Sequence, residues 1–423
     1  MKNKLKIFIT MFLIINLCIL NKVHADMLSK ARIGNEYYDT LEEAILNASS
    51  NDTIILTSDS LLDDTIIINK NVNINLNNHD ISADEKVFLV QGGSLNLSGK
   101  GTIKEKKPYY GAIVVVGSEN LDDVDYSTLS VSKDITLEGW SGIFIDHSDN
   151  NNSSGVLINM NGNINALNDV DGDTGIGVYV NGNIKHDENA PIINLSNTVN
   201  IKSTGFGIYS AGNANYYING AHIEGVEAGI GIKSGMFKIL DGEIFGTGPN
   251  KTPTEGNNNG INASGTAIQI ESNAGYYGNI ELDIRDGLFQ SKESYVIYEY
   301  TVNGSSTQIK EISLSGGDYV SLNDSDVFKM SDSFNGKHKG FISGGNYSSS
   351  PSSYLIEGHS ATLDNNMYVV VNKEISNNFP LIIKNNKNNN YTWSIVITTL
   401  VLFVIIIYIN RTKVKEILLG KNK

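Results

Sequence analysis

Hydrophobic and polar residues alternate with a period of two over most of the chain, in short runs separated by Gly, Asn, Asp and Ser. This alternation predicts half-buried β-strands. The strands group into units of three, and the first strand of each unit recurs at spacings of 24 to 38 residues. The recurring first strands are expected near Val87, Ile113, Ile143, Ile176, Phe206, Ile230, Ile268, Val296 and Val327.

Units of three strands with variable turns predict an all-β fold, a parallel β-helix over residues 53–340. Each three-strand unit would form one coil of the helix, about nine coils in all. One coil cannot bury its own apolar face, so each coil must stack on its neighbours. The many asparagines between the strands fit this fold, because stacked amides form hydrogen-bonded ladders. A β-sandwich is the alternative, but the pattern has no evident hairpin turns.

The two ends of the predicted rod need covers, because unpaired strand edges promote aggregation. Within residues 26–52, Leu41, Ala44 and Ile45 line one helical face, and Thr40 stands before them at the capping position. We expect this amphipathic helix to close the first coil. Residues 341–372 depart from the strand pattern and are expected to form the closing cap. The pattern shows no second helix before residue 391.

Several glycine-led strands share a motif, which includes "GIGIKSG" at residues 229–235. Its glycine spacing does not fit a phosphate-binding loop, and a strand pattern follows it instead of a helix. The side chains expected to point inward are Ile143, Ile145, Phe206, Ile208, Ile230, Ile232, Ile268 and Ile270. The outward column is then expected to comprise Asp146, Tyr179, Tyr209, Lys233, Glu271 and Glu299. Lys233 is expected to be solvated beside Glu271.

The chain ends predict export and membrane anchoring. Residues 1–25 have the basic start, apolar run and small-residue cleavage site of a signal peptide, and they contain the only cysteine, Cys18. After a linker over 373–390, residues 391–410 are apolar and long enough to span a bilayer. The basic tail 411–423 predicts a cytoplasmic C-terminus. We therefore expect a single-pass cell-membrane protein with an extracellular ectodomain and no disulfide.

The part between the two apolar segments is strongly acidic. It retains 23 of the 32 basic and 45 of the 46 acidic residues, a net charge near −22. Nucleic acids and other polyanions bind basic surfaces, so this charge argues against nucleic acid as a partner. The charge is also what keeps an extracellular surface soluble.

Three segments resemble a known group of proteins: "ARIGNEYYDTLEEAILNASSNDTIIL", "INKNVNINLNNHDI" and "GGNYSSSPSSYLIEGHSA". Together with the glycine-led strands, they are similar to bacterial cell-surface, adhesin-like proteins of the right-handed parallel β-helix, pectate-lyase-like superfamily. The similarity covers about residues 31–372. It implies the right-handed β-helix but not one activity, because this fold includes lyases, hydrolases and adhesins.

Candidate catalytic residues are few. Glu271 and Glu299 would lie about one coil apart, near the ~5 Å carboxylate separation of a retaining glycosidase. Asp146 lies in "FIDHSD", which is similar to an Ile-Asp-His segment of pectate lyases. Those enzymes use an arginine base and calcium, whereas the arginines before the apolar C-terminal segment are Arg32 and Arg285, both far from Asp146 in the sequence. These residues leave a polysaccharide-degrading enzyme, either a lyase or a glycoside hydrolase, as the alternative to a non-catalytic binding protein.

Cofactor and ligand candidates remain. Asp169, Asp171 and Asp173 form an acidic turn that is either a weak Ca²⁺ site or a solvated loop. No other cofactor is predicted. Tyrosines offer an apolar face with a hydroxyl, which suits neutral glycans or a protein partner. The tyrosine candidates for binding are Tyr179, Tyr209, Tyr216, Tyr217, Tyr276 and Tyr277. The sequence thus predicts a non-catalytic, adhesin-like surface protein.

Overall fold

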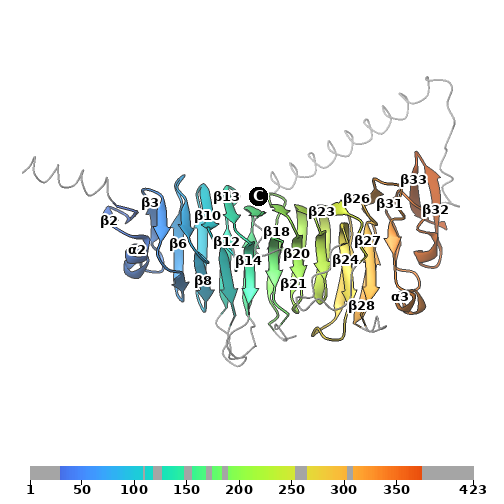
Figure 1. Ribbon diagram of the computed structural model, residues 1–423, viewed down its shortest axis with the longest axis horizontal. Helices are drawn as coiled ribbons and strands as arrows, with labels where there is room; N and C mark the ends of the chain where they lie inside the picture. Colours follow the sequence, from blue (N-terminus) through green and yellow to red (C-terminus); the bar gives the residue numbers. More distant parts are fainter. Residues whose placement is uncertain are drawn as a thin grey trace, which may run out of the picture. The chain divides into compact units, whose positions relative to one another are not determined.

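A computed structural model describes residues 29–107, 110–117, 126–146, 155–167, 174–182, 189–252, 264–302 and 308–373. These residues belong to one compact body. They are mostly β-strand, and nearly all of the strands pair in parallel with strands of the preceding and following units (Figure 1). The long parallel sheets are compatible with a β-helix, and we call each unit of three strands a coil.

The strands form three parallel ladders. Sheet B is one ladder of ten strands, and it includes all nine of the predicted first strands. Its strands are β5 (Ile66–Ile68), β8 (Phe88–Gln91), β11 (Ile113–Val116), β14 (Ser141–Asp146), β17 (Ile176–Val180), β20 (Phe206–Ser210), β22 (Ala228–Ile232), β24 (Thr266–Ser272), β27 (Ile297–Thr301) and β30 (Phe328–Lys329).

The other two ladders share sheet A, and two long strands, β21 (Asn215–Gly225) and β23 (Gly235–Pro249), belong to both of them. The rest of ladder A1 is β3 (Thr53–Leu56), β6 (Asn71–Asn75), β9 (Ser94–Ser98), β12 (Ser127–Val131), β15 (Val156–Met160), β18 (Ile192–Leu195), β25 (Ile280–Ile284) and β28 (Ile309–Leu314). The rest of ladder A2 is β4 (Ser60–Leu62), β7 (Ile81–Ala83), β10 (Gly101–Glu105), β13 (Ile135–Glu138), β16 (Asn163–Ala166), β19 (Asn200–Ser203), β26 (Leu288–Glu293), β29 (Asp318–Ser321) and β31 (Asn346–Tyr347).

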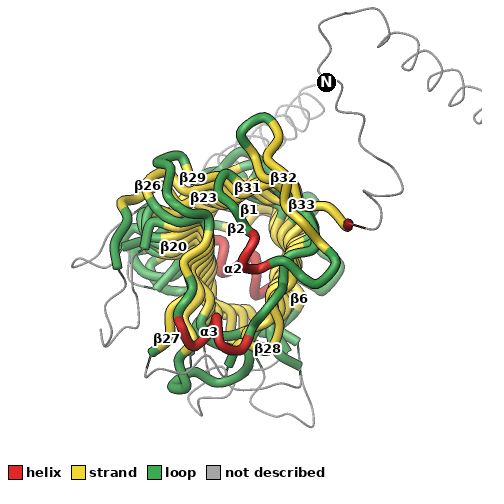
Figure 2. Tube along the Cα trace, turned by 90° about the vertical axis from the view of Figure 1, so that its right-hand side faces the viewer, coloured by secondary structure: helices red, strands yellow, loops and turns green. Residues whose placement is uncertain are grey.

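The inward side chains of all three ladders form one apolar core. Viewed end-on, the strands surround this core as a ring (Figure 2). The predicted inward isoleucines at 143, 145, 208, 230, 232, 268 and 270 are all buried in the core. Phe206 was predicted to point inward as well, but it packs in a separate cluster with Tyr209 on the outer face of sheet B, so that prediction was wrong.

Glycine recurs beside these isoleucines because the core is narrow there. A Cβ added at Gly207 would lie 2.4 Å from Cγ2 of the core residue Ile223, which belongs to ladder A2. At Gly177 the corresponding distance, to Cγ2 of Ile201, is 2.3 Å. A side chain at either position would force a core isoleucine to move, which accounts for the glycine-led motif.

The first coil is closed as predicted, with an added hairpin. Helix α2 (Leu41–Asn47) buries Leu41, Ala44 and Ile45, and the Thr40 hydroxyl accepts a hydrogen bond from the backbone N–H of Glu43 at 3.1 Å. The hairpin of β1 (Ala31–Ile33) and β2 (Glu36–Tyr38) precedes the helix, and β1 pairs antiparallel with β3. This antiparallel pairing ends ladder A1.

The other end differs in detail from the prediction. Ladder A2 continues through β31, inside the range predicted for the closing cap. Strands β32 (His359–Asp364) and β33 (Met367–Asn372) then form an antiparallel hairpin that pairs with β31. Two short helices that the sequence pattern did not predict also occur here, α3 (Asp332–Lys337) and the 3₁₀ helix η1 (Ser352–Tyr354).

Candidate binding face on sheet B

The outer face of sheet B has a continuous column of side chains at one register position. The pairing of neighbouring strands aligns, in order, Ile67, Leu89, Val114, Phe144, Tyr179, Tyr209, Gly231, Gln269, Tyr298 and Lys329. We call this set the central column. Its first six members are apolar or aromatic, which is unusual for the outward face of an acidic protein.

Four aromatic rings gather in the middle of this face, and we call Trp140, Phe144, Tyr179 and Tyr209 the aromatic platform. The rings of Phe144 and Tyr179 stack with centroids 4.7 Å apart and an interplanar angle of 2°. Tyr209 lies 5.4 Å from Tyr179, and the Trp140 ring meets Tyr179 edge-on at 6.0 Å. The prediction that Tyr179 and Tyr209 lie one coil apart on the same face is confirmed.

The two tyrosines differ in exposure. Tyr209 is buried beneath Phe206 and its aromatic neighbours, whereas Tyr179 and Trp140 are only half-buried. Burial raises the pKa of Tyr179 to about 12, and it also raises the pKa of Tyr209 well above its ordinary value. Both hydroxyls are therefore neutral at physiological pH. Phe144 covers one face of the Tyr179 ring, and Tyr179 and Trp140 are the two rings of the platform that remain partly exposed.

A second column, displaced by two residues along each strand, contains the polar groups. It includes Asp146, Lys233, Glu271 and Tyr300. The predicted outward column combined members of these two columns, because residues two positions apart point to the same side of a strand. Asp146 is half-buried, and its Oδ1 accepts a hydrogen bond of 2.8 Å from Nδ2 of Asn181 in the next coil. This pair places a carboxylate and an amide beside the aromatic platform.

Lys233 was predicted to be solvated, and this prediction was wrong. Its side chain is 1% exposed, and its Nζ lies 2.6 Å from Oε2 of Glu271, which is 2% exposed. The Tyr300 hydroxyl also donates to Glu271, at 2.6 Å. Nζ lies 4.9 Å from the centre of the Tyr276 ring, which comes from the turn after β24. That turn covers the ion pair, so an outward position in a strand does not ensure contact with water.

The predicted acid pair is not formed. Glu271 is aligned with Tyr300, whereas Glu299 is aligned with Ile270 and points into the core. Glu299 is 1% exposed, its Oε2 accepts a hydrogen bond of 2.9 Å from the backbone N–H of Ser331, and burial raises its pKa. The two carboxylates therefore lie on opposite faces of sheet B and cannot act on one substrate as a glycosidase pair.

The other predicted tyrosines lie in different environments. Tyr216 was predicted to bind a ligand from a turn, but it lies in β21 and is buried in the core, where it stacks on Phe237 at 4.1 Å. Tyr217 follows it, points outward from ladder A1 and is 38% exposed. Tyr276 and Tyr277 lie in a turn, as predicted, and Tyr277 is 39% exposed. Only Tyr179, Tyr209 and Tyr276 of the six are gathered on one face.

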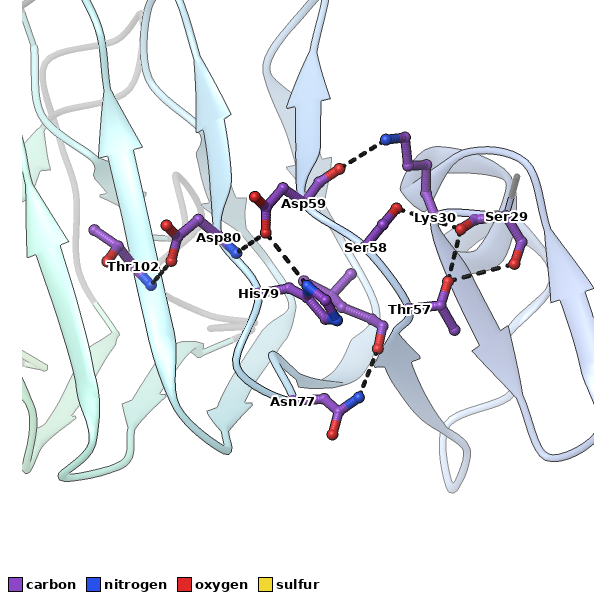
Figure 3. A network of polar contacts seen from close by, with 10 residues as sticks. Ser29, Lys30, Thr57, Ser58, Asp59, Asn77, His79, Asp80 and Thr102 are labelled. Carbon is purple, nitrogen blue, oxygen red and sulfur yellow. Dashed lines mark hydrogen bonds and ion pairs between the residues drawn. The ribbon is translucent and has the colours of Figure 1, made fainter. Parts of the chain in front are cut away.

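Among the described residues, no group of three or more acidic, histidine or cysteine side chains is arranged to hold a metal ion. The acidic turn of Asp169, Asp171 and Asp173 lies outside the described residues, as does His147. A polar network that includes Asp59 and Asp80 does occur near the first coils (Figure 3). Both aspartates also line a polar groove of about 390 Å³. These acids have structural partners in neighbouring coils.

The network ties neighbouring coils of ladder A2 together. Asp59 Oδ1 accepts a hydrogen bond from the backbone N–H of Asp80 at 3.1 Å, and Asp80 Oδ1 accepts one from that of Thr102 at 2.7 Å. Nδ1 of His79 lies 3.3 Å from Asp59 Oδ1. The hydrogen bond from Asp80 is the main reason that the pKa of Asp59 is lowered. Figure 3 shows each aspartate bonded to the following coil, which is a stabilising role.

Sequence reasoning missed Trp140 and Phe144 as members of the site. Phe144 lies at the same distance after the motif glycine Gly142 as Tyr179 does after Gly177, so alignment on these glycines would have found it. The sequence signal that could have identified Phe144 was therefore its position two residues after a motif glycine. No such signal identifies Trp140, because it precedes the strand.

No helix within the described ranges has the length and hydropathy of a membrane span, and the predicted span at residues 391–410 lies outside them. Comparison with protein-family models, with curated proteins and with solved structures found no match for this chain.

Proposed function

We propose that this chain is an extracellular, adhesin-like protein with a right-handed parallel β-helix, and that it binds a neutral glycan without catalysis. The proposed binding site is the aromatic platform together with the neighbouring Asp146 and Asn181 side chains. A protein partner is the second ligand class that such a surface suits, and the experiment below separates the two.

The observation that supports this proposal is the half-buried ring of Tyr179, which is flanked by Trp140 and lies beside a carboxylate and an amide. Aromatic rings present an apolar face to the C–H groups of a sugar, while polar side chains next to them orient the hydroxyls. Neighbouring coils are about 4.8 Å apart. That spacing is close to the size of one sugar ring, so a chain of sugars can follow the column.

Charge favours a neutral ligand over a polyanion. The predicted ectodomain has a net charge near −22. The only lysine in the polar column beside the platform, Lys233, is buried in an ion pair with Glu271 and cannot neutralise a bound anion. A polyanionic polysaccharide would therefore be repelled at this face.

Anchoring is the second part of the proposal. Residues 391–410 are apolar, aromatic residues stand near both ends of this segment, and the following residues are basic. These features support a single membrane span with a cytoplasmic tail. The external part should then be cut by added protease in intact cells while the tail is protected, and release of the full-length chain into the medium would refute anchoring.

The test of binding uses the purified full-length chain on panels of neutral and anionic glycans and of candidate proteins. We expect saturable binding to a neutral glycan, lost in Tyr179→Ala and retained in the matched control Tyr217→Ala on ladder A1. Equal binding by both variants would place the site elsewhere. Cleavage of a glycan by the wild-type protein would replace the proposal with the enzyme hypothesis.

A further inference from the structure

We propose that Lys233 and Asn273 become joined by an intramolecular amide bond, formed with the help of Glu271, that covalently links two neighbouring coils. The inference is independent of the proposed binding function. It starts from the buried Lys233–Glu271 ion pair, which no binding role explains, and from the groups that surround it.

The three reacting groups meet at the carboxylate of Glu271. Lys233 follows β22, and its Nζ lies 2.6 Å from Glu271 Oε2. Asn273 lies directly after β24 in the adjacent coil, and its Nδ2 donates to Glu271 Oε1 at 2.9 Å. One carboxylate therefore contacts both a nucleophile and the leaving group of a carboxamide.

The side-chain carbonyl of Asn273 is held by a backbone hydrogen bond. Its Oδ1 accepts a hydrogen bond of 2.9 Å from the backbone N–H of Gly275. A fixed N–H donor at this position stabilises the negative charge that develops on the oxygen when a nucleophile attacks. The backbone of Asn273 is fixed in turn, because its N–H donates to Oε1 of Gln308 at 2.5 Å.

The surroundings favour a neutral, nucleophilic amine. Burial lowers the pKa of Lys233, although the neighbouring Glu271 charge opposes that shift. Rings of Tyr209 and Tyr276 lie within 5.5 Å and 4.9 Å of Nζ. A desolvated lysine with a neighbouring base is an activated nucleophile.

The reaction balances without any oxidant or cofactor. Glu271 accepts a proton from the Lys233 ammonium, and the free amine attacks Cγ of Asn273 to form the Nζ–Cγ bond. Glu271 then transfers a proton to Nδ2, and the Cγ–Nδ2 bond breaks. The departing ammonia takes up the proton that Nζ loses as the amide forms, and it leaves as ammonium. A lysine ammonium and a carboxamide are thus converted into one secondary amide and one ammonium ion.

Mass spectrometry of the purified full-length chain tests the proposal directly. The intact mass should be lower than that of the processed sequence by one ammonia. After trypsin digestion, residues 203–238 and 252–285 should appear as one joined species that is not cleaved after Lys233. The matched control is the exposed pair of Lys310 and Glu281, whose Nζ and Oε1 lie 2.7 Å apart and whose peptides should remain linear.

Two variants assign the roles. Asn273→Ala keeps the ion pair but removes the carboxamide, and Glu271→Gln removes the base, so both should give linear peptides at this site. Linear peptides with unmodified Lys233 and Asn273 from folded wild-type protein would overturn the proposal, and this readout does not depend on whether a variant folds. An amide between Lys233 and Glu271, or an unchanged cross-link in Glu271→Gln, would also overturn it.

Discussion

Removal of Lys233 should strongly destabilise the fold, although the residue occupies an outward position. Lys233→Ala would leave the Glu271 carboxylate, which is 2% exposed, without its cationic partner, since its remaining donors, the Tyr300 hydroxyl and the Asn273 amide, are neutral. Breaking one side of a buried ion pair costs about 3–5 kcal/mol. An exposed pair costs ~0.2–1 kcal/mol, which is the expectation for Lys310→Ala, because its lysine is 62% exposed.

Urea unfolding followed by circular dichroism measures this difference. In an Asn273→Ala background, where Lys233 stays unlinked and charged, and with an m-value of about 3 kcal/mol/M, Lys233→Ala should lower the unfolding midpoint by about 1 M or more, and Lys310→Ala should barely change it. The double variant Lys233→Met/Glu271→Leu removes both charges and should recover most of the loss. Asn273→Ala removes the proposed amide while keeping the ion pair, so it separates the two contributions. A loss below ~1 kcal/mol in Lys233→Ala would refute the inferred burial.

Three further predictions concern the core, the buried acid and the first helix. Ile230→Asp should lower the free energy of unfolding by more than about 4 kcal/mol because Ile230 is fully buried, whereas Ile67→Asp should change it by no more than about 0.5 kcal/mol because Ile67 is 57% exposed. Similar losses for the two variants in thermal unfolding would refute the inward register. The pKa of Glu299 is raised in the folded state, so as pH rises the unfolded state loses this proton first, and the stability of the fold decreases from the unfolded-state pKa upward. Glu299→Gln should remove this decrease, and a pH profile of the melting temperature that is the same in the variant would contradict the burial of Glu299. Thr40→Ala removes the cap of α2 and should cost about 1 kcal/mol in urea unfolding, with no loss expected if the hydroxyl bond to Glu43 is absent in solution.

Much of the strand layout could be predicted from the sequence, because each coil repeats the same period-two pattern over the same core. All nine predicted first strands occur, and the only sheet B strand that the list of first strands omitted is β5, which the alternation does indicate as a strand. The register of a strand was harder to predict where two apolar residues are adjacent in the sequence. Val296 and Ile297 are both buried, so the pattern allowed either alignment, and the wrong one placed Glu299 beside Glu271.

The candidate site was less predictable because its environment depends on distant segments. The alternation identifies Lys233 as outward, but only the turn that contains Tyr276 determines that it is buried. Tyr216 could have been recognised as a core residue, because it has the same strand phase as the buried Ile218. Its description as a turn residue ignored that phase.

Trp140 offers the most direct measurement of the proposed binding site. The chain has two tryptophans, Trp140 and Trp393, so Trp393→Phe leaves Trp140 as the sole indole reporter in the aromatic platform. In this full-length variant, titration with the neutral glycan selected on the panels should give a saturable change in tryptophan fluorescence. The added change Tyr179→Ala should weaken the affinity about tenfold, as expected for the loss of one stacking contact of about 1.4 kcal/mol. Calorimetric binding of the glycan with no change in Trp140 emission would contradict a site on the outer face of sheet B.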